Sequence, residues 1–191
     1  MSGFRHVDDT EIWAGYVYRL VTGTFESPSG ERFDRHIVRT PGAVTVVPIV
    51  YDEADVGRST PRVVLISQYR AAHDKFVIEI PAGTRDVAGE ADEDNVRREL
   101  IEEVGLRAGN LEYLTSIFPS TAMTDSDNAI FLATDCERVE RTPHGPEEEF
   151  AEIIEIPLTE AIEWVDSGKI ADAKSVVGVL LAERHLRARQ R

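Results

Sequence analysis

The sequence lacks the features that mark disulfide-rich and membrane proteins. It contains a single cysteine, Cys136, so no disulfide bond can form within one chain. No stretch approaches the roughly 18 consecutive apolar residues of a membrane-spanning helix, and no basic segment with an apolar run opens the sequence. We therefore expect a soluble, cytoplasmic protein that has no membrane partner.

Positively charged residues are also scarce. The chain has 21 lysine and arginine residues against 35 aspartate and glutamate residues, and its net charge is −14. Binding to a nucleic-acid backbone requires a basic surface, so we expect no nucleic-acid partner. A nucleotide is still compatible with this charge, because metal ions can join acidic side chains to phosphates. The five histidines show no zinc-binding spacing, and there is no nucleophile–base motif.

Strand-like and helix-like segments alternate along the chain. Its 191 residues, 42% of them hydrophobic, suffice for one domain with room for a small additional unit. Strands are predicted for the apolar and β-branched runs at 43–51, 63–68, 76–80, 111–118, 129–134 and 151–156. Helices are predicted before Gly105, at 159–167, and from 173 to about 187. This order predicts an α/β fold with a mixed sheet and helices on both sides.

Residues 1–40 are predicted to form a small β-subdomain, followed by the main domain at 41–191. Residues 12–25 and 33–38 are rich in aromatic and β-branched side chains, and the sequence SPSG between them is a turn signal. A sheet this small is marginal in water and needs a partner surface. We therefore expect the subdomain to mediate a homodimer.

Aromatic residues of this subdomain have two interpretations. Trp13, with Tyr16 or Tyr18, could pack in a core or an interface, or could contact a nucleotide base. Packing is favoured, because large aromatic side chains are more often buried by protein than reserved for a ligand.

Three glutamates on one face of a predicted helix are the most informative feature of the sequence. Residues 98–106 read RELIEEVGL, and helical spacing places Glu99, Glu102 and Glu103 within an arc of roughly 100°. The neighbouring apolar stripe consists of Val96, Leu100 and Val104. Like charges this close repel by about 0.2–0.5 kcal/mol per pair on an exposed helix. A hard divalent cation such as Mg²⁺ would turn this repulsion into binding.

Both ends of this helix are marked. Asp92 and Asp94 are candidate N-caps, and they place negative charge at the positive end of the helix dipole. Gly105 is a C-cap signal, because glycine adopts the left-handed conformation at little cost. The loop that leads into the helix from Pro81 is compatible with backbone carbonyls that reach a metal.

At these residues the sequence resembles the Nudix hydrolase family. Its box reads Gly, five residues, Glu, seven residues, then Arg-Glu-apolar-any-Glu-Glu-any-Gly-apolar, and the match is complete from Glu90 onward. Six residues rather than five separate Gly83 from Glu90, which we interpret as a one-residue loop insertion. The resemblance implies an α/β/α sandwich with a mixed sheet, and in the sugar-nucleotide branch a small N-terminal β-subdomain that often helps form a homodimer.

The resemblance also implies roles for residues of the box. The metal, Mg²⁺ or Mn²⁺, would be held by the Ala82 carbonyl with Glu99, Glu103 and Glu102. Arg98 would orient these carboxylates, and Glu90 would fix the junction of loop and helix. Glu102 and Glu103 are therefore candidate catalytic residues together with Arg98.

Segments outside the box resemble the ADP-ribose pyrophosphatase branch. Residues 68–70 (QYR) and 79–83 (EIPAG) precede the box, and Arg70 could pair with a substrate phosphate. The branch places a water-activating acid and a further metal ligand where this chain has three consecutive glutamates, in a predicted loop before the strand at 151–156. Glu147 or Glu148 is the candidate base and Glu149 the candidate ligand.

One departure affects the choice of substrate. Members that cleave ADP-ribose usually carry Pro-Gly about sixteen residues after the last box glycine, where this chain has Thr121-Ala122. We therefore expect Thr121 and Ala122 to contact the substrate and to affect its selection. The resemblance implies a hydrolase that cleaves ADP-ribose to AMP and ribose 5-phosphate, or a related nucleoside diphosphate sugar. The alternatives are another nucleotide sugar, such as GDP-mannose or a UDP-sugar, and a non-catalytic ADP-ribose sensor. Sensors usually lose box glutamates, and this chain keeps them all.

Overall fold

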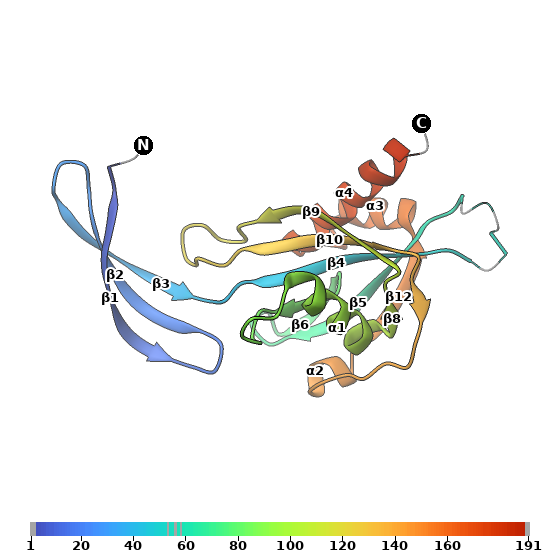
Figure 1. The fold of residues 1–191 in the computed structure, drawn as a ribbon, viewed down its shortest axis with the longest axis horizontal. Helices are drawn as coiled ribbons and strands as arrows, with labels where there is room; N and C mark the ends of the chain where they lie inside the picture. The colour runs from blue at the N-terminus through green and yellow to red at the C-terminus, as the bar shows by residue number, and fades with distance from the viewer. Residues whose placement is uncertain (1–2, 53, 56, 58, 190–191) are drawn as a thin grey trace. The chain divides into compact units, whose positions relative to one another are not determined.

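The structure is a computed structural model that describes residues 3–52, 54–55, 57 and 59–189. The chain divides into two compact units, coloured along the sequence in Figure 1. The first unit comprises Met1–Gly42 together with Phe118–Asp127, and the second comprises Ala43–Ile117 together with Asn128–Arg191. Nothing in the sequence indicated that the segment Phe118–Asp127 belongs with the N-terminal residues.

The first unit contains a three-stranded antiparallel sheet in the order β1-β2-β3. Its strands are β1 (Arg5–Ala14), β2 (Arg19–Glu26) and β3 (Arg32–Arg39). Gly30 lies in the turn before β3 at φ 83°, a left-handed conformation that glycine adopts without steric cost. The backbone N–H of Val38 donates to the Met123 carbonyl at 2.9 Å, which ties the segment 118–127 to β3.

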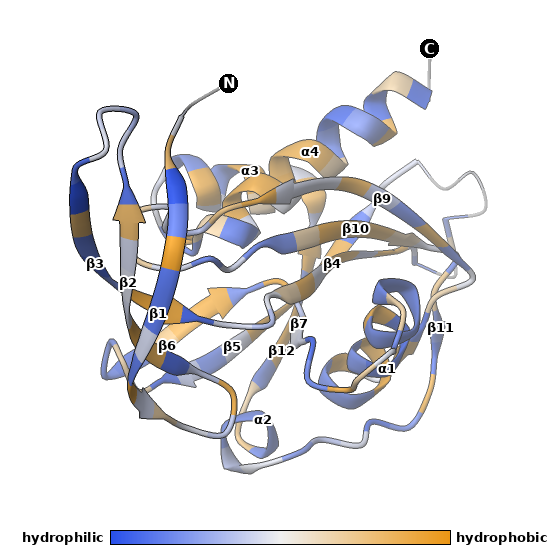
Figure 2. Cartoon of the chain, turned by 60° about the vertical axis from the view of Figure 1, so that its left-hand side comes forward, coloured by the Kyte–Doolittle hydropathy of each residue, from blue (hydrophilic) through white to orange (hydrophobic). Residues whose placement is uncertain are grey.

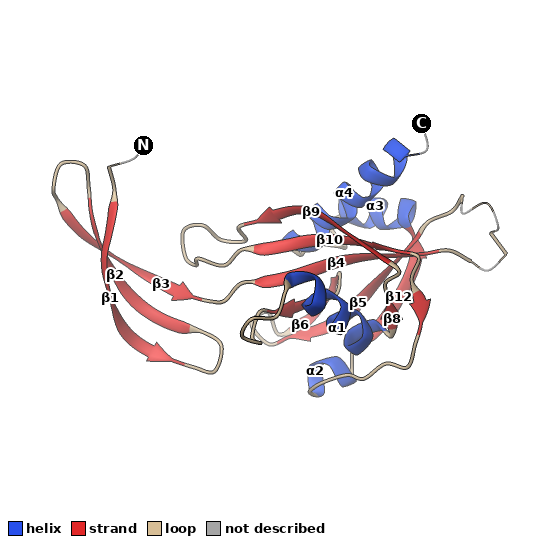
Figure 3. Ribbon diagram, in the orientation of Figure 1, coloured by secondary structure: helices blue, strands red, loops and turns tan. Residues whose placement is uncertain are grey.

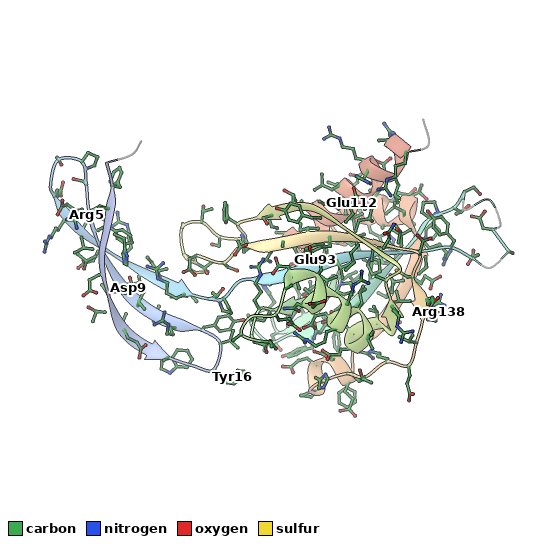
Figure 4. All side chains as sticks on the ribbon, viewed as in Figure 1. Arg5, Asp9, Tyr16, Glu93, Glu112 and Arg138 are labelled. Atoms are coloured by element: carbon green, nitrogen blue, oxygen red, sulfur yellow. The ribbon has the colours of Figure 1, made fainter. Side chains whose placement is uncertain are left out.

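Several large apolar side chains of the first unit are exposed in the single chain. Trp13 is 58% exposed, Tyr18 52% and Tyr16 96%. Figure 4 labels Tyr16 at the turn between β1 and β2, where its ring projects from the ribbon. Packing of these rings in a core of the single chain is therefore wrong, because strand β1 and the turn after it are largely exposed. Packing at an interface stays a prediction.

The second unit contains a seven-stranded mixed sheet (Figure 3). Its main path runs β12-β5-β4-β10-β9, with β6 paired to β5 and β7 paired to β4. Strands β4 and β10 are parallel, and the other pairs are antiparallel. The strands are β4 (Ala43–Val50), β5 (Arg62–Arg70), β6 (Lys75–Glu79), β7 (Ala82–Thr84), β9 (Asn110–Ile117), β10 (Asn128–Thr134) and β12 (Glu152–Pro157). A separate two-stranded sheet pairs β8 (Leu106–Arg107) with β11 (Glu137–Arg138).

Helices cover both faces of this sheet, as the sequence predicted. One hydrophobic cluster joins the sheet to α1 (Asp92–Val104). The other cluster joins it to α3 (Leu158–Asp166) and α4 (Ala173–Arg189). Alternate residues of β4 enter the two clusters, Val46 on the α1 side and Val47 on the other, which is why this strand is hydrophobic along its length (Figure 2).

Three local expectations from the sequence are wrong. The N-cap of α1 is Ala91 and no side chain caps it, so neither Asp92 nor Asp94 is the N-cap. Asp92 is instead the first helical residue, and its carboxylate binds the Arg85 guanidinium at 2.7 and 2.9 Å. Residues Ala82–Thr84 form β7 rather than a loop, and the acidic segment Pro146–Glu149 forms the short helix α2.

Residues 52–61 connect the strands predicted at 43–51 and 63–68. Residues 53, 56 and 58 of this connection lie outside the described residues. Among the helices in the described part of the chain, none is both long and apolar enough to cross a membrane.

Candidate active site

Helix α1 turns two of its glutamates toward the interior of the second unit. Val96 and Leu100 are fully buried against the sheet, and this packing fixes the rotation of the helix. The neighbouring arc then brings Glu99 and Glu103 inward, where they are only 7% and 3% exposed. Glu102 lies nearer the rim, because its side chain is 16% exposed.

The backbone of β7 runs directly beside these carboxylates. The Ala82 N–H donates to Glu103 Oε2 at 2.8 Å. A Cβ atom placed on Gly83 would lie 2.1 Å from Glu99 Oε1, so only glycine allows this close approach. The Ala82–Gly83 peptide therefore contributes backbone polar groups to the same small region as the two buried acids.

Burial makes these two carboxyl groups reluctant to ionise. It raises the pKa of Glu99 to about 7, with the charges of Glu102 and Glu148 adding to the effect and Arg98 opposing it. Burial likewise raises the pKa of Glu103 to about 8, against the opposing hydrogen bond from the Ala82 N–H. A cation placed between these carboxylates would remove the cost of charging them.

Arg98 is engaged by acids of this region. Its guanidinium forms a fork with Glu90 at 3.1 and 3.0 Å, and Nη1 also donates to Glu99 at 2.8 Å and to Glu102 at 3.2 Å. The hydrogen bonds to Glu90 raise the pKa of Arg98, so the guanidinium stays charged. Arg98 thus ties the loop before α1 to the outer side of the glutamate cluster.

A cavity of about 540 Å³ opens above the glutamates. Most of the residues predicted from the sequence line it, namely Arg70, Ala82, Arg98, Glu99, Glu102, Glu103 and Glu148. Glu147 and Glu149 are not among its lining residues, and both are exposed. The short helix α2 explains the difference, because it turns only the middle of the three glutamates toward the cavity.

Glu148 is held in place by its own segment. Its Oε2 accepts the His144 N–H at 2.7 Å, and its backbone carbonyl accepts from Arg141 Nη2 at 2.5 Å. The His144 ring lies 3.6 Å from Glu102, which links this segment to α1. The sequence held no spacing signal for His144, since the contact depends on the path of the chain between β11 and α2.

Arg70 is oriented by a buried ion-pair network that the sequence did not reveal. Its guanidinium forms a fork with Glu79 at 2.7 and 2.8 Å, and the Lys174 ammonium contacts the same carboxylate. Lys174 also binds Asp172 at 2.9 Å. Burial alone would raise the pKa of Glu79, but its two cationic partners outweigh burial and lower it. Glu79 is therefore ionised, and it directs the Arg70 head group at the edge of the cavity.

The predicted specificity residues Thr121 and Ala122 belong to the first unit. There they line a cavity of about 560 Å³ together with Phe25, Phe33 and Arg39. The rings of Phe25 and Phe33 stack with centroids 5.7 Å apart. The structure thus groups Thr121 and Ala122 with aromatic side chains of the N-terminal sheet.

The second unit offers a suitable donor set for a divalent cation. Glu99 and Glu103 are buried carboxylates, and the Ala82–Gly83 backbone lies against them. Over the described ranges, no three acidic, histidine or cysteine side chains lie close enough to form a metal cluster by themselves. Mg²⁺ typically takes one or two protein carboxylates and completes its shell with water and substrate phosphates, so the residues present fit this ion.

The mixed sheet between α1 and α3–α4, with buried acids on α1 and an adjoining cavity, defines a hydrolase of the Nudix class. Residues 40–177 match the family described as NUDIX domain, and the chain belongs to this family. The sequence-based prediction of a Nudix hydrolase with an α/β sandwich fold is thus confirmed.

Individual relatives refine this placement. The chain is 32% identical to the ADP-ribose pyrophosphatase of Bacillus subtilis over 169 residues, which covers 88% of this chain and 86% of the relative. It is also 32% identical to the methanol dehydrogenase activator of Bacillus methanolicus, over 92% of this chain and 90% of the relative. A crystal structure of an ADP compounds hydrolase shares the fold with a TM-score of 0.81 and 21% identity, over 97% of this chain and 95% of that one. The chain is therefore an ADP-ribose pyrophosphatase-like Nudix hydrolase.

Proposed function

We propose that this protein is a Mg²⁺-dependent pyrophosphohydrolase that cleaves ADP-ribose to AMP and ribose 5-phosphate. The observation that carries the proposal is the cavity in which buried Glu99 and Glu103 face Glu148 and Arg70. Its acids suit a cation, and its arginine suits a phosphate. The similarity to ADP-ribose pyrophosphatase supports the choice of substrate.

Different residues of the cavity would bind the cation and the substrate phosphate. Glu99, Glu103 and the Ala82 carbonyl would hold a divalent cation, Mg²⁺ or Mn²⁺, with Glu102 at the rim. When bound, the cation would neutralise diphosphate oxygens and lower the pKa of a bound water. Arg70, preset by Glu79, would bind a phosphate of the substrate. Arg98 would hold Glu99 and Glu102 in position rather than contact the substrate.

Of the three candidate acids on α2, we propose Glu148 as the general base, because it alone lines the cavity. Its carboxylate would accept a proton from the attacking water. The water oxygen would bond to one phosphorus, the bridging P–O bond would break, and the bridging oxygen would leave with the other phosphate. Glu147 and Glu149 would then act only through the charge of α2.

A panel of nucleoside diphosphate derivatives would test the substrate. Each compound is incubated with the protein and Mg²⁺, and the products are separated by chromatography. We expect AMP and ribose 5-phosphate from ADP-ribose, at a higher kcat/KM than for GDP-mannose or UDP-sugars. Binding of ADP-ribose without any product would instead support the sensor interpretation.

A related nucleoside diphosphate sugar is the second candidate substrate. The observation that favours it is Thr121-Ala122, which stands where ADP-ribose members carry Pro-Gly. Replacing these two residues by Pro-Gly should change the ratio of kcat/KM between ADP-ribose and other nucleotide sugars by roughly ten-fold. A uniform decline for all substrates would contradict a role of this loop in specificity.

We also propose that residues 1–40 mediate a homodimer and that the protein acts in the cytoplasm. The exposed Trp13, Tyr16 and Tyr18 rings support the interface, because several large apolar side chains exposed on one small unit favour a partner surface. The cytoplasmic location stays a prediction from the sequence.

A further inference from the structure

Strand β5 changes from apolar to polar residues on the face that meets α1. Val64 and Ile66 belong to the cluster that packs against this helix. Side chains two residues apart on a strand share a face, so Gln68 and Arg70 continue the same row. Both line the candidate active-site cavity, where the apolar packing of α1 gives way to its glutamates.

The side chain of Gln68 is buried without a donor for its oxygen. Gln68 is only 5% exposed, and its Oε1 accepts no hydrogen bond from any residue that the structure describes. The Arg70 guanidinium is two residues away on the strand, but its Nε and Nη2 donate to Glu79 at 2.7 and 2.8 Å. A buried acceptor without a donor costs stability, so a ligand that satisfies this oxygen gains affinity.

The surroundings of Gln68 indicate the chemistry of that ligand. Glu99, Glu103 and Glu148 line the same cavity, and once ionised their carboxylates offer acceptors rather than donors. Carboxylate and side-chain amide oxygens gathered in one place suit a hard divalent cation and its bound waters.

We propose that Gln68 is a further binding residue of the cation site, with its Oε1 facing the hydrated divalent cation held by Glu99 and Glu103. This inference rests on the proposed function, since it takes the cation site as given. It adds a neutral oxygen from β5 to the carboxylates of α1, so the sheet and the helix would hold the cation jointly.

Mn²⁺ binding by the full-length protein, followed by titration and by thermal melting, tests this role without any turnover. Gln68→Met keeps the length of the side chain and removes its oxygen. Gln68→Glu replaces the neutral oxygen by a charged one. Glu103→Gln reports on the cation site itself.

The two Gln68 variants should differ from wild type in opposite directions, both in the melting temperature without metal and in the affinity for Mn²⁺. Without metal, Gln68→Met should melt at the wild-type temperature or higher, because an unsatisfied acceptor is removed. Its apparent Kd for Mn²⁺ should rise roughly 10-fold. Gln68→Glu should melt at a lower temperature without metal, because it adds like charge to the cluster, and should bind Mn²⁺ at least as tightly as wild type.

The outcomes separate this inference from the proposed function. If Gln68→Met binds Mn²⁺ with wild-type affinity, the proposed role of Gln68 is overturned. If Gln68→Met fails to fold, Gln68→Glu decides the question, and weaker Mn²⁺ binding by Gln68→Glu then overturns the role. A wild-type protein that binds no Mn²⁺, or a Glu103→Gln protein that binds it normally, overturns the cation site and with it this inference. Weak binding in Glu103→Gln with normal binding in Gln68→Met overturns the inference alone.

Discussion

At the scale of single residues, the site depends on buried charges whose partners lie far away in the sequence. Glu79 and Lys174 are 95 residues apart and meet in the interior, and Arg70 completes their network. Glu99 and Glu103 are buried with less compensation, which raises the pKa of each. The contrast favours a supporting role for Glu79 and Lys174, and it supports the proposed cation site at Glu99 and Glu103.

Gly83 offers a residue-scale test of this arrangement. In Gly83→Ala, the added Cβ would lie 2.1 Å from the Glu99 carboxylate, so Glu99 must move. We expect turnover at limiting Mg²⁺ to fall at least roughly ten-fold, because sub-ångström placement matters for catalysis. Steady-state kinetics over a range of Mg²⁺ concentrations would measure this.

Gly89→Ala is the matched control for this variant. Gly89 lies in the loop that connects β7 to α1, and a Cβ there meets no atom within 4 Å, although its φ of 81° adds backbone strain. Gly89→Ala should lose stability and keep its Mg²⁺ response. Equal losses of the Mg²⁺ response in both variants would show that contact of the new methyl group with Glu99 is not what weakens the site.

At the scale of elements, different residues fix the rotation of α1 and the point where it ends. Its apolar stripe packs on the sheet, and its C-terminus closes at Gly105, which has φ 64°. The Gly105 N–H donates to the Ile101 carbonyl at 3.1 Å, and Val139 N–H donates to the Gly105 carbonyl at 2.9 Å. Gly105 thus ends the helix, and its carbonyl also anchors the segment after β11 that leads toward α2.

Gly105→Ala should therefore destabilise the fold more than an alanine that is strained only by its positive φ. Its Cβ would lie 2.8 Å from the Val139 carbonyl, in addition to the strain of a left-handed alanine. We expect a loss of more than about 1 kcal/mol in the free energy of unfolding. Chemical denaturation would measure it, with Gly168→Ala as control, since Gly168 has φ 75° and open space around its Cα. Equal losses in the two variants would contradict the crowding argument.

Sequence periodicity predicted most elements because their hydrophobic faces are long. The continuous apolar run of β4 and the apolar stripe on α1 reflect burial against whole layers, so they are visible locally. Strand β7 was missed because its three residues gain their hydrogen bonds by pairing with β4, not from local propensity. The sequence identified Gln68 only as part of the QYR motif. That its side-chain oxygen is buried without a hydrogen bond is a property of the assembled cavity. The choice of Glu148 among three glutamates likewise depends on how α2 is turned.

At the scale of the whole molecule, the chain combines a unit that carries the candidate active site with an N-terminal sheet whose strand β1 is largely exposed. The candidate active-site residues lie in the second unit, and the exposed rings of Trp13 and Tyr16 lie in the first. A three-stranded sheet with exposed aromatic side chains needs further apolar contact to be stable. A second copy of the chain would supply it.

Sedimentation at micromolar concentration tests this prediction. The wild-type chain should sediment as a dimer, and the double variant Trp13→Ser, Tyr16→Ser should shift toward monomer because it removes two exposed rings. Leu180→Ser serves as control, because Leu180 is 41% exposed on α4 of the other unit. A wild-type monomer, or a dimer that the double variant leaves intact, would contradict dimerisation through the N-terminal sheet.

We propose above that buried carboxylates of α1 hold the cation that promotes cleavage of a nucleoside diphosphate sugar. Turnover of ADP-ribose by wild type and by Glu103→Gln, measured across Mg²⁺ concentrations alongside thermal melting, tests it most directly. We expect Glu103→Gln to fold, to melt at or above the wild-type temperature without metal, and to lose roughly 100-fold or more in kcat. A Glu103→Gln protein that folds normally and turns over ADP-ribose at the wild-type rate at limiting Mg²⁺ would contradict the account.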